Sequence, residues 1–470
     1  MFVLGIDSST QSTKAVAADA ETGEVVATGK ALHPAGTEVD PWAWWDAAQQ
    51  AIGQVAEQVP GPIAAVSVAA QQHGMVAVDA DGDPVRDALL WNDTRSAPQA
   101  RGLVERHGAE RLARRTGLVP VASFTATKLA WLAEHEPHLA DRVDRVLLPH
   151  DWLTWLLAGR PERACTDRGD ASGTGYFDPA AGAWLPDLLA EVLRGRSPRL
   201  PEVLGPHESP GRVAGFEPLE GAVLGAGTGD NMAGALGLGA GPGDVVVSLG
   251  TSGTAFAVAE EPCADPRGEV AGFCDATGRF LPLVCTLNAA RVLSASAEML
   301  GTDLAGLDRL ALRAQPGAGG LSLLPYLDGE RTPDLPEAAG TLTGLRGGNM
   351  SPENVARAAV EGMLCGLADG VDALRRVGVE VRRVLLIGGA GESAAVREVA
   401  PSLFGVPVEI PESAEYVALG AVKQAAWAAT GAPAPPAWRL RAERCPAEKI
   451  YQGEAVRHAY HQARRAVHGI

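Results

Sequence analysis

The strongest constraint on the fold is a hairpin pattern that occurs twice, half a chain apart. An apolar run at residues 2–6 leads into a hydroxyl-rich turn and then into a second apolar run at 14–18. Residues 244–258 have the same order, and Thr10 corresponds there to Thr251. A repeat of this length indicates a duplicated domain and not a small solenoid unit.

The length and composition of the chain agree with two ordinary globular domains. With 470 residues the chain is too long for one core, and we expect domains at 1–238 and 239–470. The net charge of −17 argues against nucleic acid or an anionic membrane as a partner. The six cysteines contain no C-x-x-C pair, so we expect reduced thiols and neither a zinc centre nor a redox pair.

The N-terminus lacks the basic segment of a signal peptide, and no apolar run reaches the roughly 18 residues of a membrane span. We therefore expect a cytoplasmic protein. Its oligomeric state is left open, with a homodimer among the options.

Strands alternate with helices in both halves; the segment 63–68 predicts a strand, and Asp40-Pro41 and Ser351-Pro352 predict helix starts. The fold class is therefore α/β, with a mixed sheet in each half and a ligand site between the halves.

Residues 225–234 place four glycines around Asp230 and Asn231. Glycine allows backbone and ligand to approach closely. An apolar strand at 222–224 precedes this turn and a small-residue helix follows it, so Asp230 is expected at a strand-to-helix corner, not held on a helix or strand face. There it could accept a proton from a bound hydroxyl group. The alternative is an aspartate that only caps the helix, and this segment alone does not decide between them.

The tips of the two hairpins carry backbone N–H and hydroxyl groups that can bind phosphates. A Gly-Gly pair after the strand at 384–387 and before a helix suits the approach of a nucleotide. Asp7, at the first tip, can hold Mg²⁺ directly or through water. The alternatives are two ordinary polar hairpins and a simple strand-to-helix turn. The candidate ATP-binding residues are Thr10, Ser12, Thr13, Gly250, Thr251, Ser252, Gly388, Gly389, Ala390 and Ser393.

Gln72 and His73 follow the strand at 63–68 and offer an amide and an imidazole to vicinal hydroxyl groups. For one isolated histidine we favour the alternative, in which a local backbone group satisfies the ring.

Residues 123–135 and 340–361 resemble the two signatures of the FGGY family of carbohydrate kinases, and the similarity runs from residue 1 to about 430. The resemblance implies two actin-like, ribonuclease-H-like domains, with ATP and sugar bound in the cleft between them. The segments 72–75, 91–95, 229–231 and 327–333 are most similar to the members of the family that phosphorylate xylulose.

This resemblance implies ATP-dependent phosphorylation of D-xylulose, with ATP and Mg²⁺ as cofactors. It assigns Asp230 as the general base and Asp7 as the acidic group at the metal and phosphate end. It places the sugar at Gln72, His73, Trp91, Asp230 and Asn231.

Two alternatives remain. One is another sugar or polyol kinase of the family, acting on glycerol, ribulose or gluconate. The other is an actin-like or chaperone-type ATPase, which would not need a base at Asp230. Two departures from the family pattern leave the adenine contacts after Ser393 and the role of Asp275 open.

Overall fold

The computed structural model describes residues 1–438, 440–446 and 453–470, and the chain divides into two compact units. The first unit comprises residues 1–239, 260–281 and 414–439, and the second comprises 240–259, 282–413 and 440–470. The predicted boundary between residues 238 and 239 lies at the end of the segment 1–239 of the first unit. The segments 260–281 and 414–439 are additions to the first unit that the sequence does not foresee.

The first unit is a mixed sheet with helices and smaller strand pairs around it. Its strands are β1 (Phe2–Ser8), β2 (Ser12–Asp19), β3 (Val25–Leu32), β4 (Glu38–Val39), β5 (Ile63–Ala70), β6 (Val76–Val78), β7 (Ala88–Leu89), β8 (Arg145–Leu147), β9 (Cys165–Asp167), β10 (Phe177–Asp178), β11 (Ala183–Trp184), β12 (Glu202–Leu204), β13 (Gly211–Arg212), β14 (Val223–Leu224), β15 (Thr228–Gly229) and β18 (Ala271–Cys274). Its helices are α1 (Pro41–Ala56), α2 (Ala97–His107), α3 (Ala109–Thr116), α4 (Thr125–His135), α5 (Pro137–Ala140), α6 (Pro149–Leu157), α7 (Arg168–Ala171), α8 (Pro186–Val192), α9 (Asp230–Leu238) and α14 (Tyr416–Thr430).

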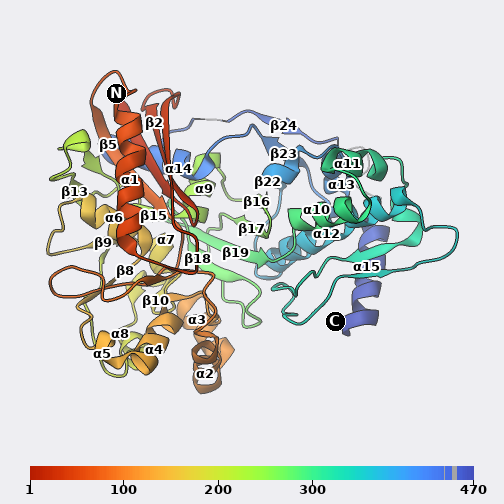
Figure 1. The fold of residues 1–470 in the computed structure, drawn as a ribbon, viewed down its shortest axis with the longest axis horizontal. Coiled ribbons are helices and arrows are strands. Elements are labelled where there is room, and N and C mark those ends of the chain that lie inside the picture. Colours follow the sequence, from red (N-terminus) through yellow and green to blue (C-terminus); the bar gives the residue numbers. More distant parts are fainter. Residues whose placement is uncertain (439, 447–452) are drawn as a thin grey trace. The chain divides into compact units, whose positions relative to one another are not determined.

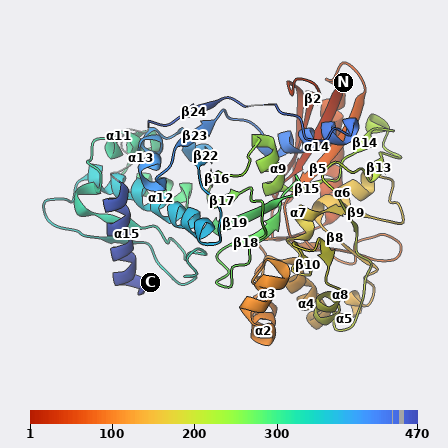
Figure 2. The ribbon, with the colours of Figure 1, turned by 180° about the vertical axis from the view of Figure 1, so that it is seen from behind.

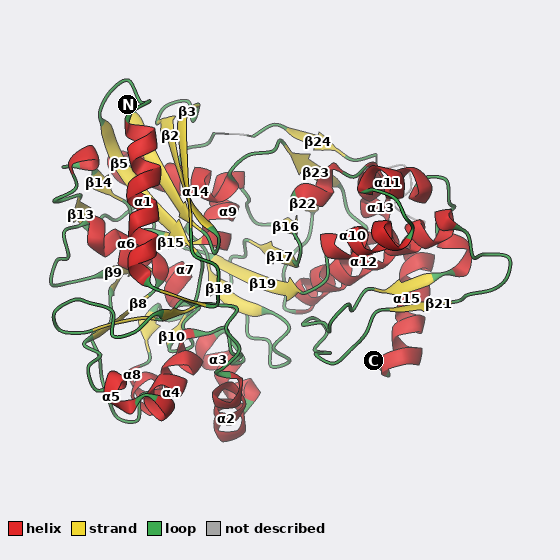
Figure 3. Ribbon diagram, viewed as in Figure 1, coloured by secondary structure: helices red, strands yellow, loops and turns green. Residues whose placement is uncertain are grey.

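The second unit is built on a sheet of the same kind. Its strands are β16 (Asp244–Leu249), β17 (Gly253–Ala257), most of β19 (Phe280–Thr286), β20 (Ser322–Leu324), β21 (Thr341–Thr343), β22 (Arg383–Ile387), β23 (Val408–Pro411) and β24 (Ala442–Arg444). Its helices are α10 (Ala290–Met299), α11 (Leu304–Ala311), α12 (Pro352–Arg376), α13 (Ala394–Phe404) and α15 (Gly453–His468). Figure 3 distinguishes these helices and strands by colour.

The two main sheets confirm the predicted repeat. In the first, the strand order is β13-β14-β5-β1-β2-β3, and β1 runs antiparallel to β2 and parallel to β5. In the second, the order β24-β23-β22-β16-β17-β19 places β16 antiparallel to β17 and parallel to β22. Both predicted hairpins are present, and each half has a mixed sheet.

Helices cover both faces of the first sheet. Figure 1 shows α1 in front of the strands, and Figure 2, seen from behind, shows α14 and α9 on the opposite side. Helix α1 begins at the predicted residue, where the Asp40 carboxylate accepts a hydrogen bond from the backbone N–H of Trp42. Its buried side, which includes Trp44 and Ile52, packs with Leu4 in one hydrophobic core. Burial of these large side chains stabilises the layer by about 1.5–3 kcal/mol each.

Glycines allow α14 to approach its neighbours at backbone distance. A Cβ atom on Gly5 of β1 would overlap the carbonyl oxygen of Ala418 in α14. A Cβ atom on Gly420 of α14 would overlap the carbonyl oxygen of Ala233 in α9. Helix α14 therefore approaches β1 at Gly5 and α9 at Gly420 at backbone distance.

In the second unit the sequence did not predict the C-terminal helix α15. The carboxylate of Asp369 in α12 accepts hydrogen bonds from Arg457 and Arg464 of α15, and His461 Nε2 lies 2.7 Å from its Oδ1 atom. None of the six cysteines, all within the described ranges, forms a disulfide; three are buried and three are half-buried. None of the helices within the described ranges is long and apolar enough to cross a membrane.

We predict that Gly420→Ala lowers the free energy of unfolding by about 1–3 kcal/mol, because the added methyl group has no space against α9. Gly53→Ala in α1 is the matched control, since a Cβ atom there meets nothing within 4 Å. That change should be neutral or stabilise the protein by up to about 1 kcal/mol. Urea unfolding of both variants measures the difference; equal stabilities would contradict the close packing of α14.

Candidate active site

Asp230 is the first residue of α9, directly after β15, which pairs with β5. Gly229 is the N-cap, and the Asp230 Oδ1 atom accepts hydrogen bonds from the backbone N–H and the side-chain amide of Asn231, both at 2.8 Å. The strand-to-helix corner is as predicted, but Asp230 lies within the first helical turn and not in a free loop. Gly229 and not Asp230 occupies the N-cap position, although the Asp230 carboxylate does accept one backbone N–H of the first helical turn.

Several predicted sugar-binding residues lie together around this turn. The Asn231 side-chain amide also donates to Oε1 of Gln72, at 3.3 Å. Thr10 Oγ1 donates to Oε1 of Gln71 at 3.3 Å and accepts from the indole N–H of Trp91 at 2.9 Å. A chain of polar contacts thus links the first hairpin tip to Trp91 and to the end of β5.

Some buried polar atoms in this region have no hydrogen-bond partner within the described part of the protein. They are Oδ1 of Asp7, Nε2 of Gln71 and Nε2 of Gln72. Leaving such a group unpaired costs about 1–3 kcal/mol. Unpaired donors and acceptors that remain in a folded protein suit a ligand that carries hydroxyl or phosphate groups.

The two carboxyl groups of the site hold protons more tightly than ordinary aspartates do. Burial, followed by the negative charge of Asp230, raises the pKa of Asp7 to about 7, and Lys14 opposes this. Burial raises the pKa of Asp230 to about 6, against the hydrogen bonds from Asn231. Carboxyl groups shifted in this way are common in catalytic sites.

Asp7 fits the predicted Mg²⁺ site. Mg²⁺ keeps several waters and binds proteins through one or two carboxylates together with substrate phosphates. The buried, unpartnered Oδ1 of Asp7 is an oxygen donor of the required kind.

His73 has a positive φ of 68°, and its Nδ1 atom lies 2.9 Å from the carbonyl oxygen of Gly173. Phe124 and Phe273 flank the ring, with centroids at 5.1 and 5.5 Å. A backbone group therefore does satisfy one ring nitrogen, but it comes from 100 residues away in the chain. The role of His73 at the sugar stays a prediction.

The predicted phosphate-binding residues differ in accessibility. In the second unit, Gly250, Thr251 and Ser252 are exposed at the hairpin tip. In the first, Thr13 is fully buried, and its hydroxyl oxygen lies 2.8 Å from Nε2 of His33. Ser12 is also buried, so within this tip Thr10 is the more accessible hydroxyl.

The Gly-Gly turn after β22 has the geometry that a close backbone approach requires. Gly388 has a φ of 93°, and a Cβ atom there would lie 2.7 Å from the carbonyl oxygen of Leu249. Gly389 is exposed, and Ala390 is half-buried. Ser393 caps α13, and its hydroxyl donates to Asp308 at 2.5 Å. The ATP contacts of these residues remain predictions.

Asp275 has a local role that the sequence left open. Its carboxylate accepts hydrogen bonds from Thr277 and from the backbone N–H of Arg279, so it organises the turn after β18.

A buried ionic cluster that no sequence pattern signals lies beneath the Asp230 turn. It consists of His150, Asp151, Asp167 and Asp170, all 4% exposed or less. No spacing rule connects α6 with α7 in the sequence, so only the fold brings these side chains together.

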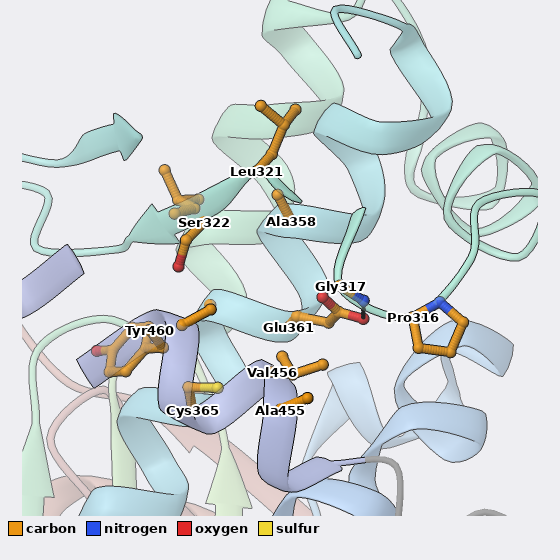
Figure 4. A pocket seen from close by; sticks show the side chains of 13 residues that line it. Pro316, Gly317, Leu321, Ser322, Ala358, Glu361, Cys365, Ala455, Val456 and Tyr460 are labelled. Atoms are coloured by element: carbon orange, nitrogen blue, oxygen red, sulfur yellow. Dashed lines mark hydrogen bonds between the residues drawn. The ribbon is translucent and has the colours of Figure 1, made fainter. Parts of the chain in front are cut away.

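A cavity of about 120 Å³ in the second unit lies between α12 and α15 (Figure 4). Its one carboxylate, Glu361, is paired with Arg357, and most of its lining is apolar. The described residues that line it include no cation for a phosphate group, and we assign it no part in catalysis.

Comparisons with known proteins agree with the predicted resemblance. Residues 2–237 match the N-terminal domain of the FGGY family of carbohydrate kinases, and residues 245–429 match its C-terminal domain. The chain is 49% identical to a xylulose kinase of Streptomyces coelicolor over 92% of this chain and 88% of that protein. It is 34% identical to a xylulose kinase of Escherichia coli over 98% and 96%.

Among solved structures, the xylulose kinase from Bifidobacterium adolescentis is similar, with a TM-score of 0.92, 44% identity and 99% of both chains covered. A glycerol kinase from Plasmodium falciparum shares the fold at 19% identity, with a TM-score of 0.83 over 92% of this chain and 90% of that one.

We predict that Asp230→Asn stabilises the ligand-free protein by about 1–2 kcal/mol at pH 8. The folded-state pKa of about 6 exceeds the ordinary value of 3.8, so ionisation of Asp230 costs stability as the pH rises through this window. An asparagine escapes this cost, and the difference should therefore vanish near pH 4. Asp46→Asn, at an exposed position of α1, is the control. Thermal unfolding at both pH values tests this; an equal difference at pH 4 and pH 8 would contradict it.

Proposed function

Since the chain belongs to the FGGY family of carbohydrate kinases, we propose that it transfers the γ-phosphate of ATP to D-xylulose, giving D-xylulose 5-phosphate and ADP. The observation that carries the proposal is the Asp230 carboxylate, oriented by Asn231 beside the unpaired amide nitrogen of Gln72. The named relatives support xylulose as the acceptor.

Asp230 acts as the general base. It takes the proton of the terminal sugar hydroxyl while that oxygen forms a bond to the γ-phosphorus and the bond to the ADP oxygen breaks. With a pKa of about 6, Asp230 is ionised at neutral pH and still basic enough to accept the proton. The two hydrogen bonds from Asn231 fix its orientation.

The sugar is held by the groups at the end of β5. The Gln72 amide, the imidazole of His73 and the indole of Trp91 offer hydrogen bonds or a flat surface to the sugar. Positioning accounts for much of the rate in phosphoryl transfer, because the protein does little covalent chemistry itself.

Mg²⁺, when bound, neutralises charge on the transferring phosphate. Asp7 would hold it, and the hydroxyl and backbone groups at Thr10 and at residues 250–252 would bind the phosphates. Gly388, Gly389 and Ala390 would lie beside the nucleotide. A cytoplasmic location and the oligomeric state stay predictions.

We predict that Asp230→Asn lowers kcat for D-xylulose by about 10²–10⁴-fold, because this is the usual contribution of general-base catalysis. ATP affinity should change little. A coupled assay for ADP measures kcat, and binding of an ATP analogue measures affinity. More than about half of the wild-type kcat would exclude Asp230 as the base.

We predict that His73→Asn lowers kcat/KM for D-xylulose by about 10–100-fold and leaves the slow reaction with glycerol nearly unchanged. Glycerol lacks the ketose carbonyl and two of the carbons, so it has fewer groups for His73 to contact. Asparagine tolerates the positive φ of this position. Equal losses with both acceptors would show that His73 is structural, and a wild-type preference for glycerol would contradict xylulose as the substrate.

A further inference from the structure

The turn that carries Asp230 packs against a buried ion pair. His150 Nδ1 lies 2.5 Å from Oδ2 of Asp170, and both side chains have no exposed surface. A Cβ atom on Gly227 would overlap the His150 ring, and a Cβ atom on Gly229 would lie 3.0 Å from Oδ1 of Asp170. The backbone at Gly227 and Gly229, just before Asp230, therefore packs against the His150–Asp170 pair.

A second set of contacts ties α7, which carries Asp170, to the same turn. The Asp167 carboxylate accepts hydrogen bonds from the backbone N–H groups of Gly169 and Asp170, at 2.9 and 2.8 Å. It also accepts the hydroxyl of Thr228 at 2.7 Å. A displacement of Asp170 would therefore move the residues that immediately precede Asp230.

The carboxylates around His150 favour its protonated form. Burial alone would lower the pKa of His150, but the charges of Asp151 and Asp170 outweigh it and raise this pKa to about 10. Burial raises the pKa of Asp170 to about 6, opposed by His150. Oδ1 of Asp170, the oxygen that faces Gly229, has no hydrogen-bond partner among the described residues, and its charge interacts with that of Asp230.

We propose that the buried His150–Asp170 pair is a positioning element that holds the Asp230 carboxylate in its catalytic orientation. The proposal rests on the proposed function, in which Asp230 is the base. Asp170 acts through the Gly229 backbone and through its negative charge, without touching the substrate.

The test compares Asp170→Asn with Asp265→Asn in the enzyme. Asp265 is the matched control: it is also buried, at 7% exposed, but its carboxylate accepts hydrogen bonds from the backbone N–H groups of its own turn, at Arg267, Glu269 and Val270. Asp170→Asn should lower kcat by about 10–100-fold, as expected for a misplaced base, with KM for xylulose and ATP within about threefold. Asp265→Asn should leave kcat within about twofold, whatever its effect on thermal stability.

The double variant Asp170→Asn/Asp230→Asn separates positioning from general damage. If Asp170 acts through Asp230, it should lose no more activity than Asp230→Asn alone. If Asp170→Asn does not fold, Thr228→Val, which removes the hydroxyl bound to Asp167, should lower kcat with KM unchanged.

A raised KM for xylulose at unchanged kcat would overturn the proposal and make Asp170 a sugar ligand. A further loss of activity in the double variant, or equal losses of kcat in Asp170→Asn and Asp265→Asn, would also overturn it. An active Asp230→Asn enzyme would remove the base itself and with it the proposed mechanism, whereas an inactive Asp230→Asn with a fully active Asp170→Asn would overturn the positioning alone.

Discussion

The backbone contact of α14 with β1 on one side and α9 on the other determines the geometry of the candidate site. Asp7 is on β1 and Asp230 begins α9, so the glycines Gly5 and Gly420 set how far apart the two carboxylates lie. Gln424 of the same helix donates a hydrogen bond to the carbonyl oxygen of Gly227 at 3.0 Å. Helix α14 therefore holds the Asp230 turn in place through its backbone contact with α9 and through the hydrogen bond from Gln424.

The features that the sequence predicts are those with a local cause. Alternating apolar strands around hydroxyl-rich turns identify the two hairpins, and a proline after an aspartate identifies the start of α1. Gln72 and His73 could be placed at a strand end because they follow the apolar run at 63–68. Asp230 could be placed at its corner because an apolar strand precedes it, a small-residue helix follows it, and the flanking glycines tolerate the tight turn between them.

The parts that could not be predicted depend on contacts between distant residues. Burying an isolated charge is costly, and His150 and Asp170 are tolerated in the core only because the fold makes them partners. Nothing in either segment alone signals that pairing. In the same way, the sequence predicts α14 as an apolar helix in the second half of the chain. Only its packing on β1 shows that it belongs to the first unit. Helix α15 is rich in charged side chains, and its partner Asp369 lies in another helix.

The division of the first unit into three chain segments has a consequence for biosynthesis. Residues 414–439 supply α14, and they leave the ribosome after most of the second unit has been made. Until then, the face of β1 and β5 that α14 covers stays open to solvent in the nascent chain. Surfaces of this kind are where incomplete proteins associate, so the first unit is exposed to such association until residues 414–439 have been made.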